Sequence, residues 1–258
     1  MELVQYAVKD NVCTIVMNRP EKRNALNPEL IGALKEAFTR AESDEQAKVI
    51  ILSASGQTFC AGADLGYLQQ MQQFTYEENL ADSTSLKDLF WQIYNHPKVV
   101  IAQVQGQALA GGCGLVSVCD FCFASVDATF GYTEVKIGFV PALVMAFLVR
   151  RIGEGRARQL LLTGTLIDAK EAYRMGLINC VCGKKMLEPD AISFARSIIS
   201  ANSGQAMKTT KQLLASVQSL AMEDALALAA ETNARARDTA DCRRGISAFL
   251  NKEKINWQ

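Results

Sequence analysis

Short apolar runs recur along most of the chain, and polar or glycine-bearing turns separate them. These runs are rich in Val, Ile, Leu, Phe or Cys and are too short for helices, so they predict buried strands. The strands are expected at residues 12–17, 49–52, 99–104, 121–124 and 178–182. Because helix-spaced segments lie between them, the pattern predicts an α/β fold of repeated strand, turn and helix units.

Apolar residues three or four positions apart predict the helices of these units. Asn27 and Pro28 form a start signal, and the apolar face that follows consists of Leu30, Ile31, Leu34 and Phe38. A later helix is built on Leu86, Leu89, Phe90 and Ile93. Asp168 and Glu171 have the spacing of a capping box for a helix that ends near Gly176. The polar stretch 74–85 is expected to be a mobile lid.

Beyond Asp190 the pattern contains helices alone. Apolar and charged faces alternate in the segments 191–201, 205–218, 222–236 and 242–250. We therefore predict a core of residues 1–190 and a helical C-terminal region of residues 191–258 that packs against the core or against a neighbouring subunit.

Two glycine-bearing segments follow predicted strands and begin predicted helices. They are Phe59-Cys60-Ala61-Gly62-Ala63-Asp64 and Gly106-Gln107-Ala108-Leu109-Ala110-Gly111-Gly112-Cys113-Gly114. Small residues let a carbonyl group approach the main chain, and the first N–H groups of a helix have no acceptor within that helix. Together the two segments are expected to form an oxyanion hole for an enolate.

Composition limits the classes of protein that need to be considered. The chain has 258 residues, 49% of them apolar, and its 27 Lys and Arg balance its 27 Asp and Glu. A balanced charge gives no basic field for nucleic acid. The start lacks the charged and apolar regions of a signal peptide, and no apolar run reaches the ~20 residues of a membrane span. We expect a soluble, cytoplasmic protein with no membrane partner.

The eight cysteines and the single histidine indicate neither disulfides nor a metal site. Most of the cysteines are expected to be small core residues. Cys60 and Cys113 lie beside the glycine segments, but no histidine is near in the sequence to activate them as nucleophiles. His96, in Asn95-His96-Pro97-Lys98, is expected in a surface loop.

The order of these motifs resembles the crotonase superfamily, the enoyl-CoA hydratases and isomerases. The residues that carry the resemblance are the two glycine segments, Cys119-Asp120, Phe130-Gly131-x-x-Glu134-x-x-x-Gly138, Pro141, Thr163-Gly164, Ala169-x-x-Ala172-x-x-x-Gly176-Leu177-Ile178 and the segment Gly245 to Lys252. The resemblance implies a spiral of repeated ββα units with a helical C-terminal region that builds a homotrimer or a dimer of trimers. It also implies an acyl-CoA thioester substrate and no separate cofactor.

The resemblance implies roles for three groups at the reaction centre. The N–H groups of Ala63 and Gly111 would hold the thioester oxygen, and Glu134 would transfer the proton. Apolar neighbours such as Val135, Ile137 and Phe139 are expected to desolvate Glu134 and raise its pKa.

The resemblance also implies where CoA and the acyl group bind. Lys22 and Arg23 would meet the CoA phosphates, and Phe249 and Lys252 would come from a neighbouring subunit. The main chain from Ala61 to Leu65 would line the adenine and pantetheine path. The full set of substrate and CoA residues is Lys22, Arg23, Ala25, Ala61, Asp64, Leu65, Gly112, Gly114, Phe249 and Lys252.

One position departs from the family pattern. Hydratases with two glutamates carry the second one where this chain has Gly114. Adding water usually uses two groups, whereas moving one proton between the α- and γ-carbons of a 3-enoyl-CoA uses one. We predict a hydratase, since residues 111–115 and 134–142 also resemble methylglutaconyl-CoA hydratases. The alternatives are a Δ3-Δ2 enoyl-CoA isomerase, an acyl-CoA decarboxylase and a non-catalytic scaffold.

Overall fold

The computed structural model describes residues 2–257, which form two sheets and the helices around them. The larger sheet has six strands in the order β1-β2-β3-β4-β6-β9. β1 and β2 pair antiparallel, and the later neighbours pair in parallel. The strands are β1 (Val4–Lys9), β2 (Val12–Met17), β3 (Val49–Ala54), β4 (Val99–Val104), β6 (Phe121–Ser125) and β9 (Cys180–Cys182).

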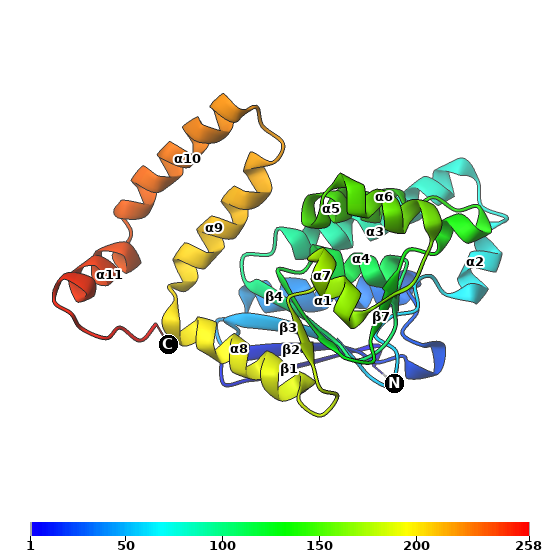
Figure 1. Cartoon of the computed structure of the whole chain (residues 1–258), viewed down its shortest axis with the longest axis horizontal. Coiled ribbons are helices and arrows are strands. Elements are labelled where there is room, and N and C mark those ends of the chain that lie inside the picture. Colours follow the sequence, from blue (N-terminus) through cyan, green and yellow to red (C-terminus); the bar gives the residue numbers. More distant parts are fainter. Residues whose placement is uncertain (1, 258) are drawn as a thin grey trace.

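Helices cover both faces of this sheet. Along β3, Ile50 and Leu52 belong to the core beneath α1, α3 and α4, whereas Val49 and Ile51 belong to the core beneath α8. Successive strand residues point to opposite faces, so a strand covered on both sides is largely apolar, as β3 is except for Ser53. Figure 1 shows α8 along one side of the sheet and α3, α4 and α5 on the other.

The helices connect the strands in chain order. Their bounds are α1 (Pro28–Ser43), α2 (Leu65–Met71), α3 (Tyr76–Tyr94), α4 (Gly111–Val118), α5 (Ala142–Ile152), α6 (Glu154–Thr163), α7 (Ala169–Met175), α8 (Leu187–Ala201), α9 (Gly204–Val217), α10 (Met222–Arg237) and α11 (Ala240–Leu250), with 3-10 turns η1 (Pro20–Lys22) and η2 (Glu134–Ile137). The predicted α/β class is therefore confirmed.

A second, smaller sheet positions the loops of the candidate site. It contains β5 (Ala108–Leu109), β7 (Thr129–Gly131) and β8 (Ile167–Asp168), in that order. β5 leads directly into α4, and β7 leads into η2. Because β5 and β7 are parallel neighbours, the start of α4 and the start of η2 lie at the same edge of this sheet.

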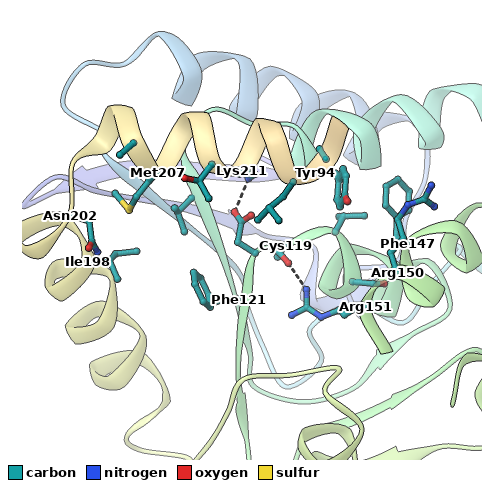
Figure 2. A pocket seen from close by; sticks show the side chains of 18 of the residues that line it. Tyr94, Cys119, Phe121, Phe147, Arg150, Arg151, Ile198, Asn202, Met207 and Lys211 are labelled. Carbon is teal, nitrogen blue, oxygen red and sulfur yellow. Dashed lines mark hydrogen bonds and ion pairs between the residues drawn. The ribbon is translucent and has the colours of Figure 1, made fainter. Parts of the chain in front are cut away.

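The last three helices extend away from the sheets (Figure 1). Residues beyond 190 are helical as predicted, although the first of these helices begins at Leu187 and packs on the sheet. α9 is attached through Lys211, whose Nζ lies 2.7 Å from Oδ2 of Asp120 (Figure 2). α10 has no buried side chain among the residues described. The division at residue 190 stays a prediction.

Lys211 also borders a groove between α9 and the rest of the molecule (Figure 2). The groove has a volume of about 770 Å³ and lies beside the C-terminal end of α4. Its apolar lining comes from Tyr94, Phe121, Phe147, Ile198 and Met207.

The stretch 74–85, predicted to precede a helix as a mobile lid, is largely helical. Most of this stretch forms the first turns of α3, which begins at Tyr76. Thr75 Oγ1 accepts from the N–H of Glu78, and the Glu78 carboxylate accepts from the N–H of Thr75. This reciprocal capping box fixes the helix start despite the polar composition. The box predicted at residue 168 is half formed, because Asp168 caps α7 while the Glu171 carboxylate pairs with Arg174.

The prediction that His96 lies on the surface is wrong. Its side chain is 2% exposed. One ring nitrogen, Nδ1, accepts from the N–H of Lys98, and Nε2 lies 3.2 Å from the main-chain oxygen of Phe38. Burial lowers the pKa of His96 to about 4. The ring is therefore a neutral bridge between α1 and the start of β4.

Candidate active site

Three segments far apart in the sequence converge at the candidate site. Leu26 forms an isolated parallel bridge with Ala63, and Cys60 forms another with Ala108. The N–H of Leu26 donates to Gly62, and its carbonyl accepts from Asp64. The main chain of Leu26 therefore pairs with Gly62 and Asp64, the residues on either side of Ala63. The N–H of Ala63 points away from Leu26.

The N–H groups of Ala63 and Gly111 are available to a ligand. Gly111 is the first residue of α4, and Ala110 before it has a φ of 50°. The N–H of Ala110 donates to Gly131, while the carbonyl of Ala110 accepts from Gly114. Within residues 2–257, neither Ala63 nor Gly111 donates a main-chain hydrogen bond to a protein acceptor. Free N–H groups at a helix start suit a developing anion.

Glycine allows the two loops to touch. A Cβ on Gly112 would lie 2.3 Å from the main-chain oxygen of Cys60, and a Cβ on Gly62 would lie 2.9 Å from Cβ of Ala110. Gly62 also has a φ of 90°, which L side chains rarely adopt. Both glycines are therefore required for the close packing that brings Ala63 and Gly111 together.

Glu134 supplies a carboxyl group beside these loops. It begins η2, three residues after Gly131, whose carbonyl accepts from the N–H of Ala110 just before α4. Its Oε2 is buried without a hydrogen-bond partner among the residues described. Burial raises the pKa of Glu134. A half-buried carboxyl group with one buried, unpaired oxygen costs stability and is typical of a catalytic acid or base.

The prediction that Val135, Ile137 and Phe139 desolvate Glu134 is partly wrong. Ile137 is 72% exposed and Phe139 is 49% exposed, so these side chains point largely to solvent. Val135 is half-buried. The 3-10 turn explains the difference, since the N–H of Phe139 returns to the Glu134 carbonyl and the turn directs its later side chains outward.

The position of the missing second glutamate is filled by apolar atoms. A Cβ on Gly114 would lie 2.5 Å from Cγ1 of Val144 and 2.8 Å from Cζ of Phe90. Phe90 comes from α3 and Val144 from α5, and both side chains are buried. A glutamate at residue 114 would therefore need both neighbours to move. This packing could not be predicted from the sequence, because the three residues lie on three different helices.

The predicted CoA residues near the first loop lie close together. Lys22 and Arg23 are exposed in and just after η1, and the N–H of Ala61 donates to the Arg23 carbonyl. The Arg23 guanidinium hydrogen-bonds with Oε1 of Gln107. Leu65 is 83% exposed, and Ala25 is buried beneath the loop.

Asp64 has a structural task that the sequence analysis missed. Its Oδ1 accepts from the N–H groups of Gly66 and Tyr67 at the start of α2, and its Oδ2 lies 2.8 Å from the Arg19 guanidinium. The helix cap and Arg19 lower the pKa of Asp64 despite its burial. The carboxylate thus holds the loop in shape.

Phe249 and Lys252 lie far from the other predicted CoA residues of the same chain. Phe249 is in α11 and 83% exposed, and Lys252 follows that helix. α11 stands at the opposite end of the molecule from α2 (Figure 1). Within one chain these two residues are not part of the site.

The cysteines beside the glycine loops are unsuited to nucleophilic catalysis. Cys60 and Cys113 are buried, and burial raises the pKa of each thiol to about 12. Both therefore stay protonated near neutral pH. Residues 2–257 contain no group of three or more His, Cys, Asp or Glu side chains placed to hold a metal ion. In the same range, no helix has the length and apolar character needed to cross a bilayer.

The chain is similar to proteins of one known family. Residues 7–258 match the family model described as enoyl-CoA hydratase/isomerase. The chain is similar to a Thermus thermophilus protein described as a candidate enoyl-CoA hydratase, with 41% identity over 95% of this chain and 96% of the relative. It is also similar to the crotonyl-CoA hydratase of Syntrophomonas wolfei, with 34% identity over 96% of this chain and 95% of the relative.

A solved structure shares the whole fold. The crystal structure of a candidate enoyl-CoA hydratase/isomerase (crotonase) from Legionella pneumophila superposes with a TM-score of 0.90 and 37% identity, and each chain covers 100% of the other. This protein belongs to the enoyl-CoA hydratase/isomerase family of crotonase-fold enzymes.

Proposed function

We propose that the protein is an enoyl-CoA hydratase, which adds water to a 2-enoyl-CoA or removes it from a 3-hydroxyacyl-CoA. The N–H groups of Ala63 and Gly111 hold the thioester oxygen, and Glu134 transfers the proton at the α-carbon. The observation that carries this proposal is the buried, unpaired Oε2 of Glu134 beside a helix start with free N–H groups.

The chemistry of a thioester fits these three groups. Proton transfer at the α-carbon places negative charge on the thioester oxygen, and two fixed N–H donors stabilise that charge. One such donor typically contributes ~10²–10³ in rate. Burial raises the pKa of Glu134, so its carboxylate accepts a proton more readily and a larger share of the carboxyl group is protonated near neutral pH.

Holding the attacking water needs a second polar group. Because Phe90 and Val144 fill the space at Gly114, no protein carboxylate reaches the site from that position. A carboxylate on the substrate itself would serve, as on a branched methylglutaconyl-type acyl chain. The names of the similar proteins, crotonyl-CoA hydratase among them, support hydration as the reaction class.

The same packing favours a second candidate reaction. A Δ3-Δ2 enoyl-CoA isomerase moves one proton between the α- and γ-carbons and needs no held water. An apolar wall of Phe90 and Val144 excludes water from that side of the reaction centre. Glu134 would then act alone as the proton carrier.

We further propose that the active unit contains several copies of the chain, a homotrimer or a dimer of trimers. Phe249 and Lys252 would reach the CoA of a neighbouring copy and complement Lys22 and Arg23. The exposed apolar side chains of the C-terminal helices support this arrangement, since Met222, Leu226 and Phe249 are unburied in the single chain.

Absorbance of the conjugated thioester separates the two reactions. We expect a 2-enoyl-CoA to lose absorbance as 3-hydroxyacyl-CoA forms, first with a crotonyl substrate and then with a methylglutaconyl one. A 3-enoyl-CoA that gains absorbance without a hydroxy product would establish the isomerase instead. If neither thioester is converted by the purified protein, the proposed function is wrong.

A further inference from the structure

Two cysteines of β9 form a close pair that the proposed reaction does not use. Cys180 and Cys182 are two residues apart on one strand, so their side chains leave the same face of the sheet. Both contact the apolar cluster beneath α8. Their Sγ atoms lie 3.6 Å apart.

The pair is accessible from one side. Cys182 is buried and Cys180 is half-buried, and the other half-buried cysteine, Cys242, lies on α11. β9 is the last strand of its sheet and is hydrogen-bonded to β6 on one side. A small reagent can therefore approach Cys180 first and find a second sulfur next to it.

We propose that Cys180 and Cys182 form a dithiol site that binds one thiophilic metal or metalloid centre through both sulfurs. Two thiolates that share a tetrahedral ion, with bonds of about 2.3 Å, have sulfur atoms about 3.8 Å apart. The observed 3.6 Å matches this separation without movement of the strand.

A direct disulfide is a poorer fit to the same strand. Disulfide-bonded residues have Cα atoms about 4.4–6.8 Å apart, most of them near 5.5–6 Å. Cα atoms two residues apart on a strand are separated by roughly 6.4–6.8 Å, at the far end of that range. Closing a disulfide would therefore pull the two residues of β9 together, whereas a bridging atom fits between the sulfurs of the existing strand.

A trivalent organic arsenical is a suitable probe, because its arsenic needs no third protein ligand. Phenylarsine oxide condenses with two thiols to form two As–S bonds and one molecule of water, with no change in oxidation state. Burial raises the pKa of Cys182 to about 12, so it enters the reaction as a thiol. Its proton and that of Cys180 leave with the oxygen of the reagent.

Intact-mass measurement of the folded full-length protein tests the proposal. We expect one phenylarsenic adduct per chain at equimolar reagent, removed by 2,3-dimercaptopropanol but retained in a similar concentration of 2-mercaptoethanol. Cys180→Ser should weaken apparent binding at least tenfold, because a single sulfur cannot chelate. Cys242→Ser is the matched control and should bind like the unchanged protein.

Three results would overturn the proposal. They are no adduct on the folded protein, equal binding by Cys180→Ser, and loss of the adduct in Cys242→Ser. Circular dichroism of each variant shows whether it is folded. Should Cys180→Ser fail to fold, iodoacetamide modification of Cys180 in the unchanged protein, mapped by peptide mass, must block the adduct. None of these results depends on hydratase activity.

Discussion

At the scale of single residues, Glu134 opposes stability while it serves the proposed reaction. Its Oε2 is buried without a partner, and burial raises its pKa. The folded protein therefore holds this proton to higher pH than the unfolded chain does. The contribution of Glu134 to the free energy of unfolding is fully present below the pKa of the unfolded chain. It is lost as pH rises through the pKa of the folded protein.

Glu134→Gln should therefore stabilise the protein at neutral pH, because the glutamine carries no charge to bury. A gain of about 1 kcal/mol would raise the Tm by about 2–4 °C. Thermal unfolding at pH 7.5 and near pH 4 measures the effect, and the difference between variant and parent should shrink at the lower pH. A constant difference at both pH values would show that the Glu134 charge costs nothing.

Gly114→Glu should destabilise the protein rather than supply the missing carboxylate. Its Cβ would overlap Val144 and Phe90, and a charge would enter an apolar site. We expect a loss of about 3 kcal/mol or more in the free energy of unfolding. Gly155→Glu is the matched control, because no atom lies within 4 Å of its added Cβ. Normal stability of Gly114→Glu in denaturant unfolding would refute the packing argument.

At the scale of elements, the site depends on contact between the loop before α2 and the loop before α4. Gly112→Ala would place a Cβ 2.3 Å from the Cys60 carbonyl and push these loops apart. We expect activity to fall at least ~10²-fold, the typical effect of losing one oxyanion donor. Gly32→Ala, on an open face of α1, should retain activity. Steady-state kinetics decide, and near-normal kcat/KM for Gly112→Ala would contradict the proposed oxyanion hole.

Elements with a long periodic signal could be predicted from the sequence, and those fixed by distant contacts could not. Residues 99–104 are apolar except for Gln103 and form β4 with the predicted bounds. β7 and β8 are too short to show a periodic pattern of apolar residues. They are defined by their pairing with each other. His96 lies in the connection between α3 and β4, as Pro97 and its polar neighbours indicate. Its burial could not be predicted, because its partner, the Phe38 carbonyl, is distant in sequence.

The candidate site also has features that the sequence predicts and features that depend on distant contacts. Ala63, Gly111 and Glu134 follow from local motifs and the family resemblance, and the structure places their loops at one sheet edge. The wall that replaces the second glutamate could not be predicted. It depends on how α3 and α5 meet α4, and a single glycine in the sequence does not show what occupies the space beside it.

At the scale of the whole molecule, a partly buried ion pair attaches the C-terminal helices. Lys211 of α9 pairs with Asp120, whose pKa is raised by burial. Lys211→Met would leave this carboxylate without its cation. Breaking a fully buried pair typically costs about 3–5 kcal/mol, and because the Asp120 side chain is 23% exposed we expect a smaller loss here. We expect a lower Tm, while Lys208→Met on the exposed side of α9 should behave like the parent. Equal thermal unfolding of both variants would mean that the pair contributes little.

The central claim is that two main-chain N–H groups and Glu134 generate an enolate from an acyl-CoA thioester. Exchange of the α-hydrogens of a saturated acyl-CoA in D₂O, followed by NMR, tests it most directly, because hydratase and isomerase share this step. We predict exchange by the unchanged protein and a rate lower by roughly 10²–10⁴ in Glu134→Gln, with acyl-CoA binding preserved in calorimetry. No exchange by the unchanged protein, or equal exchange by the variant, would contradict the claim.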